Sequence, residues 1–346
     1  MTPEPANTPF ESILEPDAPE AGGRPAAEPG IEAFVQQIKE TADKLARDRA
    51  ARGDAKLLAT ALKELRYCFK VFAGYRGRRK VTVFGSARTR PDHPAYRAAV
   101  EFGRRMAEEG YMVITGAASG IMEAGHVGAG RENSFGVNII LPFEQGANPV
   151  ILADPKLMNM RYFFSRKLVF IKESDGIALF PGGFGTHDEA FETLTLIQTG
   201  KSHIFPVVLV DEPGGDYWRR WEAFVDDGLL RRGYISPQDK FLYRITDSVE
   251  EAVREVTTFY RVYHSMRYVR GDLVLRLQRP LGERALDQIR AEFKDIVAGG
   301  TFEQTAALPQ EANEPTLAAL PRLKFRFDRH NHGRLRQLID FVNRAE

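Results

Sequence analysis

The sequence predicts an α/β fold in which a doubly wound parallel sheet carries helices on both faces. Between residues 81 and 262, short apolar runs alternate with segments whose apolar residues recur at helical spacing, and the connecting loops are short. This alternation is typical of parallel strands joined by helices. Three of the apolar runs end in glycine or other small residues, and open sheets bind ligands at the carboxyl ends of their strands. We therefore expect these three turns to form one crevice.

The chain before the alternating region divides into a tail and a helical extension. Residues 1–30 are rich in proline, alanine and glutamate, and such a composition cannot bury enough apolar surface to fold. We expect these residues to be disordered. Two amphipathic helices are predicted at 31–49 and 55–72, which makes residues 31–79 a helical N-terminal extension. The basic residues at 74–80 are interpreted as a solvated linker.

Residues 80–264 are interpreted as the sheet domain, a Rossmann-like nucleotide-binding unit. No G-x-G-x-x-G motif follows its first strand, which argues against a nicotinamide or flavin site. The predicted strands are short apolar runs at 81–84, 111–115, 134–141, 176–180 and 205–210. The predicted helices have apolar residues at helical spacing and lie at 95–108, 120–130, 161–173, 186–198, 217–227 and 248–262.

Residues 265–346 are predicted to form a small α+β unit. Apolar and polar residues alternate at 273–277 and 323–327, as in half-buried antiparallel strands, and helical patterns lie at 281–296 and 334–342 with a loop at 310–316. The basic residues on these strands are interpreted as a solvated sheet face. Asp328, His330 and His332 could suggest a metal site, but no partner cluster is visible in the sequence, and we predict no metal.

Composition excludes several classes of function. The net charge of +1 gives no global field for nucleic acid or for a membrane surface, and no apolar run is long enough to span a bilayer. The N-terminus lacks the apolar region of a signal peptide. The single cysteine, Cys68, excludes an internal disulfide and lies in a helical pattern that places it in the core. We expect a cytoplasmic protein without nucleic-acid or membrane partners.

The most informative segment is the run PGGFGTHDE at residues 181–189. It follows the apolar run at 176–180 and opens a helical pattern, an order with which α/β folds build anion sites. Gly182, Gly183 and Gly185 let the backbone approach a phosphate, and the first free N–H groups of the helix point at it. Two carboxylates, Asp188 and Glu189, then suggest chemistry beside the phosphate.

A structural explanation of the same residues must be weighed. Thr186 and Glu189 have the spacing of a capping box, in which the threonine caps a helix and the glutamate returns a hydrogen bond to the cap residue. A cap alone does not need three glycines, each of which costs backbone entropy. We therefore favour a functional Glu189, which could also serve as the cap partner.

A second candidate lies on the preceding helix. Phe164, Leu168 and Ile171 form an apolar stripe on the helix at 161–173, which predicts that it is largely buried, and Arg166 and Lys167 lie in its middle. Buried cations require a counter-ion. Either the two cations extend to the surface, or Arg166 faces the crevice and meets a phosphate or Glu189.

Together these motifs resemble the Lonely Guy (LOG) family of nucleoside 5′-monophosphate phosphoribohydrolases. The family combines an Arg-Lys pair with a following P-G-G-x-G-T-x-x-E loop, and many bacterial members carry the label lysine decarboxylase. The resemblance covers residues 81–247 and includes further motifs at 83–88, 114–116, 120–124, 141–145, 193–200 and 205–209.

The resemblance implies a site, an assembly and a reaction. Arg166 and Glu189 match the two positions regarded as catalytic. The family is usually a dimer with its site near the subunit interface, and it uses no metal or cofactor. The expected reaction is hydrolysis of AMP or a related purine or cytokinin nucleotide to the free base and ribose 5-phosphate. The matching substrate-binding positions are Gly85, Ser86, Gly116, Gly182, Gly183, Gly185 and Thr186, with Lys167, Glu123 and Asp188 as further candidates.

The sequence also departs from the family pattern. The second glycine turn reads Gly-Ala-Ala-Ser-Gly at 116–120, His187 replaces the usual leucine, and His126 replaces a common asparagine. The two added Cβ atoms restrict the backbone of the turn, which leaves base and phosphate preference open. The alternative is a nucleotide sensor or carrier of the same fold that binds without turnover. A pyridoxal phosphate decarboxylase is rejected, because Lys167 is the only lysine nearby and its neighbours do not suit the cofactor.

Overall fold

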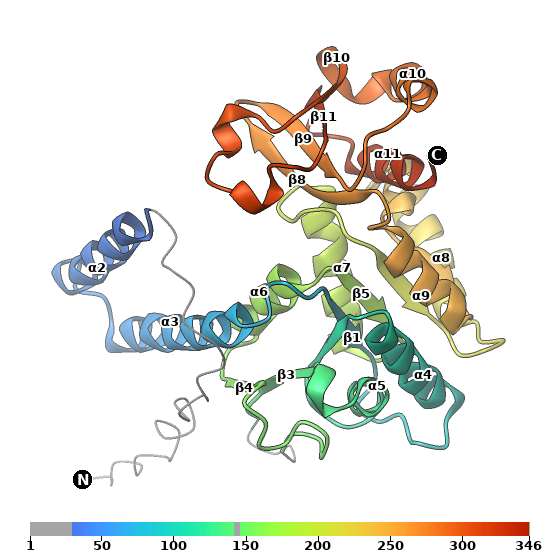
Figure 1. Ribbon diagram of the computed structural model, residues 1–346. Helices are drawn as coiled ribbons and strands as arrows, with labels where there is room; N and C mark the ends of the chain where they lie inside the picture. The colour runs from blue at the N-terminus through green and yellow to red at the C-terminus, as the bar shows by residue number, and fades with distance from the viewer. Residues whose placement is uncertain (1–29, 142–145, 346) are drawn as a thin grey trace, which may run out of the picture.

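The computed structural model describes residues 30–141 and 146–345. The predicted disordered tail therefore lies outside the described residues except for Gly30, and so does most of the motif at 141–145. Within the described residues the chain forms a large α/β domain, a projecting pair of N-terminal helices and a smaller sheet unit (Figure 1). None of the helices in these ranges is both long enough and apolar enough to cross a bilayer.

The central sheet confirms the predicted fold class. Its seven strands run parallel in the order β4-β3-β2-β1-β5-β6-β7, so the chain moves outward from β1 in one direction and resumes at β5 on its other side. Such a reversal of strand order leaves a crevice at the carboxyl ends of the two central strands. The strands are β1 (Lys80–Phe84), β2 (Met112–Thr115), β3 (Ser134–Ile139), β4 (Leu157–Met160), β5 (Gly176–Leu179), β6 (Val207–Val210) and β7 (Arg244–Thr246).

Alternate residues of each strand enter the cores on the two sides of the sheet, as strand geometry requires. In β5, Ala178 packs in one core, whereas Ile177 and Leu179 pack in the other. The first core is closed by α4 (Pro94–Glu108), α5 (Ile121–Ala129) and α9 (Val249–Thr258). The opposite face is covered by α6 (Phe163–Glu173), α7 (Phe184–Gln198), α8 (Tyr217–Phe224) and the end of α3 (Arg52–Ala73).

The C-terminal unit is an antiparallel sheet with two helices, α10 (Glu283–Glu292) and α11 (His332–Arg344). Its strand order is β10-β11-β9-β8. The inner strands β9 (Asp272–Leu277) and β11 (Arg322–Phe327) agree with the predicted period-two runs. The outer strands were not predicted, and they are β8 (Tyr263–Val269) and the irregular β10 (Val297–Thr305).

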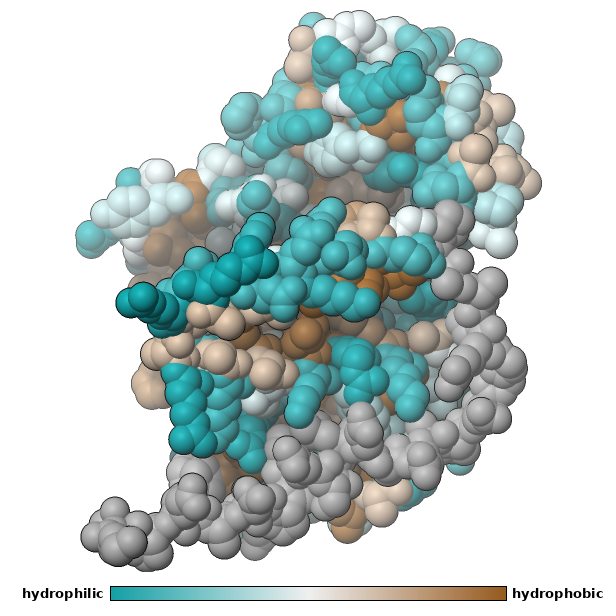
Figure 2. Space-filling view, turned by 90° about the vertical axis from the view of Figure 1, so that its left-hand side faces the viewer, coloured by the Kyte–Doolittle hydropathy of each residue, from teal (hydrophilic) through white to brown (hydrophobic). Residues whose placement is uncertain are grey.

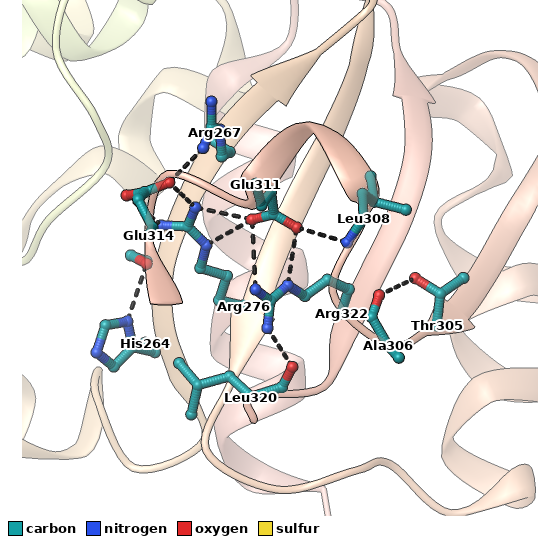
Figure 3. Close-up of polar contacts among 11 residues, drawn as sticks. His264, Arg267, Arg276, Thr305, Ala306, Leu308, Glu311, Glu314, Leu320 and Arg322 are labelled. Carbon is teal, nitrogen blue, oxygen red and sulfur yellow. Dashed lines mark hydrogen bonds and ion pairs between the residues drawn. The ribbon is translucent and has the colours of Figure 1, made fainter. Parts of the chain in front are cut away.

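The basic residues of the inner strands correct the prediction of a solvated sheet face in part, because Arg326 is exposed but other arginines are not. Arg276 and Arg322 are buried, and both bind Glu311, with Arg276 Nη2 2.7 Å from Oε1 and Arg322 Nε 3.0 Å from Oε2. Arg276 also binds Glu314 at 2.5 Å. Both carboxylates come from the segment predicted as a loop, where two short 3-10 turns, Pro309–Glu311 and Pro315–Leu317, lie over the sheet (Figure 3). Paired charges of this kind can be buried where single ones cannot.

The N-terminal helices α2 (Ile31–Arg47) and α3 project from the domain (Figure 1). The end of α3 is packed, and Cys68 is buried there as expected. The connector that follows corrects the prediction of a solvated linker in part: Arg76 is exposed, but the last two basic residues are packed against the domain. Arg79 binds Asp175 at 2.9 Å and lies 3.5 Å from the centre of the Tyr260 ring, and the buried Lys80 donates hydrogen bonds to two backbone carbonyls.

Asp328 and His332, considered above for a metal site, make contacts within the protein. Asp328 Oδ1 accepts a hydrogen bond from the backbone N–H of His330 at 2.9 Å. His332 is buried against Gly200, at which an added Cβ would lie 2.5 Å from the ring Nε2. No group of three histidine, cysteine or acidic side chains suited to a metal occurs among the described residues.

Candidate active site

A cavity of about 750 Å³ lies at the carboxyl ends of β1, β2 and β5. The three small-residue turns predicted to converge do meet there. Two of the further candidates, Lys167 and Glu123, do not line it. The predicted residues that line it are Gly85, Ser86, Gly116, Arg166, Gly182, Gly183, Gly185, Thr186, Asp188 and Glu189.

The first turn holds the other two in place. The Ser86 N–H donates to the Pro181 carbonyl at 3.1 Å, and the Ser86 carbonyl accepts from Ile121 N–H at 3.0 Å. Gly182 must be glycine, because an added Cβ would lie 2.1 Å from Thr186 Oγ1 and 3.0 Å from the Ser86 nitrogen. Close packing therefore explains this glycine, and it brings the loop next to the end of β1.

Helix α7 begins two residues earlier than predicted, and this removes the capping-box explanation. Gly183 is the N-cap residue, and its carbonyl accepts hydrogen bonds from the N–H groups of Thr186 and His187 at 3.0 and 3.2 Å. Thr186 thus lies inside the first turn, where it cannot cap the helix for Glu189. An added Cβ at Gly183 or Gly185 would meet nothing within 4 Å, so packing explains neither glycine. Both glycines border the cavity.

Glu189 is the buried acid of the cavity. Its side chain is 4% exposed, and Oε2 has no hydrogen-bond partner among residues 30–141 and 146–345. Burial raises the pKa of its carboxyl to about 7, although the nearby charges of Lys167 and Arg166 act to lower it. A carboxyl that titrates near neutrality and has an unused oxygen is typical of a group that acts on a ligand.

Arg166 lies on α6 and also lines the cavity. Its guanidinium stands 4.9 Å from the Phe163 ring centre and 5.6 Å from that of Phe170, which holds the cation against aromatic faces. An added Cβ on Gly116 would lie 3.6 Å from its Nη1. The Arg166 side chain therefore faces the crevice and reaches the second turn. This is the second of the two alternatives left open by the sequence.

The neighbouring Lys167 has another position. Its Nζ lies 2.8 Å from Asp188 Oδ2 and 2.5 Å from Glu192 Oε2, so it joins α6 to α7. Asp188 lies on the rim of the cavity and is exposed. Helix α6 was expected to be largely buried, but in the single chain Phe163, Phe164 and Leu168 are 48%, 51% and 46% exposed.

The unusual second turn is held by polar groups whose supporting role the sequence did not indicate. Ala117 has a left-handed backbone with φ of 63°, and its carbonyl accepts from the N–H and Nδ2 of Asn148 at 2.8 and 3.0 Å. The buried His126 lies 3.0 Å from Thr115 Oγ1 and 3.4 Å or less from the Asn148 side chain. Burial lowers the pKa of His126 to about 4. The alanine and histidine departures thus belong to one supporting network, while Ala118 lines the cavity.

Several other lining residues were also missed. Their side chains are mostly apolar, and periodicity assigns such residues to the core without distinguishing those that border a cavity. Asn138 could have been found, since a polar residue interrupts an apolar strand near its carboxyl end. These additional residues include Arg88, Met122, Asn138, Phe163, Phe170 and Phe184.

Comparison with known proteins confirms the resemblance stated from the sequence. Residues 114–256 match a family model described as "Possible lysine decarboxylase". A cytokinin riboside 5′-monophosphate phosphoribohydrolase of Mycobacterium tuberculosis is 37% identical over 92 residues, which are 26% of this chain and 46% of that protein. A probable enzyme of the same name from Oryza sativa subsp. japonica is 32% identical over 148 residues, 40% of this chain and 56% of the relative. The chain thus spans about half the length of these curated relatives.

Solved structures also align with this chain. The molybdenum cofactor binding protein of the phototrophic bacterium Rippkaea orientalis has 18% identity and a TM-score of 0.37, covering 52% of this chain and 96% of that protein.

Proposed function

We propose that this chain hydrolyses the N-glycosidic bond of a nucleoside 5′-monophosphate, releasing a free base and ribose 5-phosphate. One observation carries the proposal. Glu189 places a buried carboxyl, with one oxygen unused among the described residues, in the same cavity as a glycine-rich helix N-terminus. An anion site and an acid that share one cavity suit a nucleotide, in which a ribose separates the phosphate from the glycosidic bond.

The start of α7 is the proposed phosphate site. The first N–H groups of a helix have no partner within it, and its dipole favours an anion. Gly183 and Gly185 leave the space in front of these groups open, because neither glycine contacts a neighbour where a Cβ would be. Binding the 5′-phosphate there would orient the ribose. The binding energy would thus come from a group that is remote from the bond that breaks.

Glu189 and Arg166 are the proposed catalytic pair. Water adds to C1′ of the ribose while the bond to the base nitrogen breaks, and the base leaves with the electron pair and takes up a proton. The ribose passes through an oxocarbenium-like state, which the ionised Glu189 stabilises while it orients the water and the ribose hydroxyls. Arg166 fixes the phosphate or the departing base, and its charge favours the ionised form of Glu189.

The names of the relatives support this proposal, and the decarboxylase description of the family model does not suit the cavity. The two curated relatives are named for phosphoribohydrolase activity on cytokinin nucleotides. A pyridoxal phosphate enzyme needs a lysine that can form a Schiff base. Lys167 does not line the cavity and is bound to Asp188 and Glu192.

Binding without turnover is the second candidate, and one observation favours it. Ala118 adds a methyl group to the cavity wall in the turn where the family commonly has glycine. The purified protein should be incubated with a panel of nucleoside monophosphates and the matching nucleosides, while free base and ribose 5-phosphate are measured. We expect release of base from at least one monophosphate and little from the nucleosides. Tight binding without release would favour a sensor or carrier, and equal cleavage of AMP and adenosine would contradict the phosphate site.

A further inference from the structure

A hydrogen-bonded chain connects α8 to the back of the glycine loop. The Tyr217 hydroxyl lies 2.5 Å from the Gly182 carbonyl oxygen and 2.7 Å from His187 Nε2. His187 also lines the cavity. Tyr217 is the first residue of α8, and its ring packs edge-on at 4.9 Å against Trp218, which is fully buried. The ring that carries the hydroxyl is therefore packed against the core.

The protons of this chain can be assigned by counting donors. A carbonyl oxygen only accepts, so the single proton of the Tyr217 hydroxyl goes to Gly182. The Tyr217 oxygen must then accept from His187, which requires the proton of the imidazole to be on Nε2. Burial lowers the pKa of His187, which favours the neutral ring with its lone pair on Nδ1. A leucine at position 187 could not make this bond.

The hydrogen bonds determine which way the loop presents its backbone. In a trans peptide the C=O and the following N–H point in opposite directions. The Pro181 carbonyl is held by Ser86 N–H, and the Gly182 carbonyl is held by Tyr217. Two successive carbonyl oxygens are thus turned toward protein donors, and the N–H of Gly183 is turned the other way. A glycine loop has many accessible conformations, and an unrestrained one could present a carbonyl to a phosphate, which would repel it.

We propose that Tyr217 and His187 are positioning residues, which hold the glycine loop in its anion-binding conformation through the Gly182 carbonyl. The inference rests on the proposed function for the identity of the anion, the 5′-phosphate of a nucleotide. Neither residue is assigned a part in breaking the glycosidic bond. The two side chains act in series, since the His187 ring donates to the Tyr217 oxygen and the Tyr217 hydroxyl donates to the Gly182 carbonyl.

The test compares Tyr217→Phe, His187→Leu and His187→Gln with the parent. The binding of ribose 5-phosphate is measured by calorimetry, and KM and kcat are measured for a nucleoside monophosphate. Tyr217→Phe keeps the ring and removes the hydroxyl, and we expect Kd and KM to rise about fivefold to tenfold, the usual effect of one hydrogen bond, with a smaller change in kcat. His187→Leu should behave similarly. His187→Gln should be closer to the parent, because the amide can still donate. The double variant Tyr217→Phe with His187→Leu should be no worse than the single ones.

Matched controls separate positioning from general damage. Tyr234→Phe removes a hydroxyl from an exposed tyrosine, and His330→Gln changes an exposed histidine; both should bind ribose 5-phosphate as the parent does. Each variant should melt close to the parent. Unchanged ribose 5-phosphate binding in Tyr217→Phe would overturn the positioning role even if turnover is normal. If the parent binds ribose 5-phosphate but cleaves no nucleotide, the hydrolase proposal fails while the binding data still decide the role of Tyr217. If the parent does not bind ribose 5-phosphate, the positioning role fails, and the nucleotide panel alone decides the hydrolase proposal.

Discussion

At the scale of single residues, Glu189 combines two properties that oppose each other. Burial raises the pKa of its carboxyl to about 7, so the folded protein holds a proton there at pH values where the unfolded chain has released it. Ionisation of this group therefore costs stability, and the ionised form is the one that can stabilise a cationic ribose. The ionised Glu189 that the proposed reaction needs therefore lowers the stability of the folded protein.

Glu189→Gln separates these two properties. The amide resembles the protonated acid in shape and carries no charge, so we expect turnover to fall by about a hundredfold or more. The same variant should be more stable than the parent at pH 8, by up to about 3 kcal/mol, because no buried charge has to form. Denaturant unfolding and the release of free base measure the two effects. Full activity in a less stable variant would mean that the role of Glu189 is structural.

The pH dependence follows from the same shift. Because the pKa of Glu189 is raised to about 7 and the ionised form is required, kcat/KM should increase as the pH rises through about 7 in the parent. The stability that the protonated carboxyl contributes is complete below the unfolded pKa and is lost as the pH rises through the folded value. Activity and stability should thus change in opposite directions between pH 5 and 8. A flat rate profile over this range would contradict the assignment of Glu189.

At the scale of elements, the start of α7 shows a helix end that is shaped for a ligand. Gly185 lies in its first turn, and an added methyl group there would touch no neighbour. Gly185→Ala should therefore stabilise the protein by about 0.5 to 1 kcal/mol, because alanine favours a helix over glycine. The methyl group would occupy the proposed phosphate space, so binding of ribose 5-phosphate should weaken at least tenfold. Thermal melting and calorimetry test the two effects, and unchanged binding would place the phosphate elsewhere.

The elements also show what sequence patterns can and cannot predict. The five central strands were predicted from their mostly apolar sequences, because central parallel strands are buried on both faces. The edge strands β4 and β7 were missed: β7 has only three residues, and one of them, Arg244, is exposed. The start of α7 was placed too late because glycine is a poor helix former. The partners of Arg276 lie 35 and 38 residues further along the chain, and local periodicity contains no information about such distant pairs.

The site was easier to predict in its loops than in its supports. The three small-residue turns and the acid at position 189 can be identified because glycines and charges interrupt apolar runs. Their supports cannot, because Asn148 and Tyr217 act through contacts with segments that lie 31 and 35 residues away in the sequence. Residues that bind or react form local sequence motifs, whereas the residues that position them are brought together only by the tertiary fold.

At the scale of the whole molecule, the exposed apolar side of α6 suggests an assembly. Neither the N-terminal helices nor the C-terminal unit covers Phe163, Phe164 and Leu168 in the described chain. Figure 2 views the side on which α2 and α3 project and shows hydrophobic surface among the hydrophilic side chains, and the exposed residues of these helices include Ile31, Phe34, Ile38, Leu58 and Leu62. Apolar area of this kind marks interaction surfaces.

We expect a dimer in which α6 meets a second copy beside the active site. Light scattering at micromolar concentration should show two chains, and Leu168→Arg should shift the protein toward monomer and reduce turnover. Phe224→Arg is the matched control, because it places the same charge on an exposed apolar residue of α8. A fully active monomeric parent would remove the interface from the proposal and leave Arg166 and Glu189 in place.

The buried arginine–glutamate network gives the two halves of the molecule opposite responses to acid. Hydrogen bonds from Arg322 and Arg276 lower the pKa of Glu311 to about 2, against the effect of its burial. The stability it contributes is present above its unfolded pKa of about 4.5 and is lost as the pH falls toward 2. Glu189 has the reverse effect, since acidification stabilises its surroundings. Hydrogen exchange followed from pH 5 down to pH 2 should therefore show β9 and β11 losing protection before β1 and β5, so that acid opens the molecule from its C-terminal end.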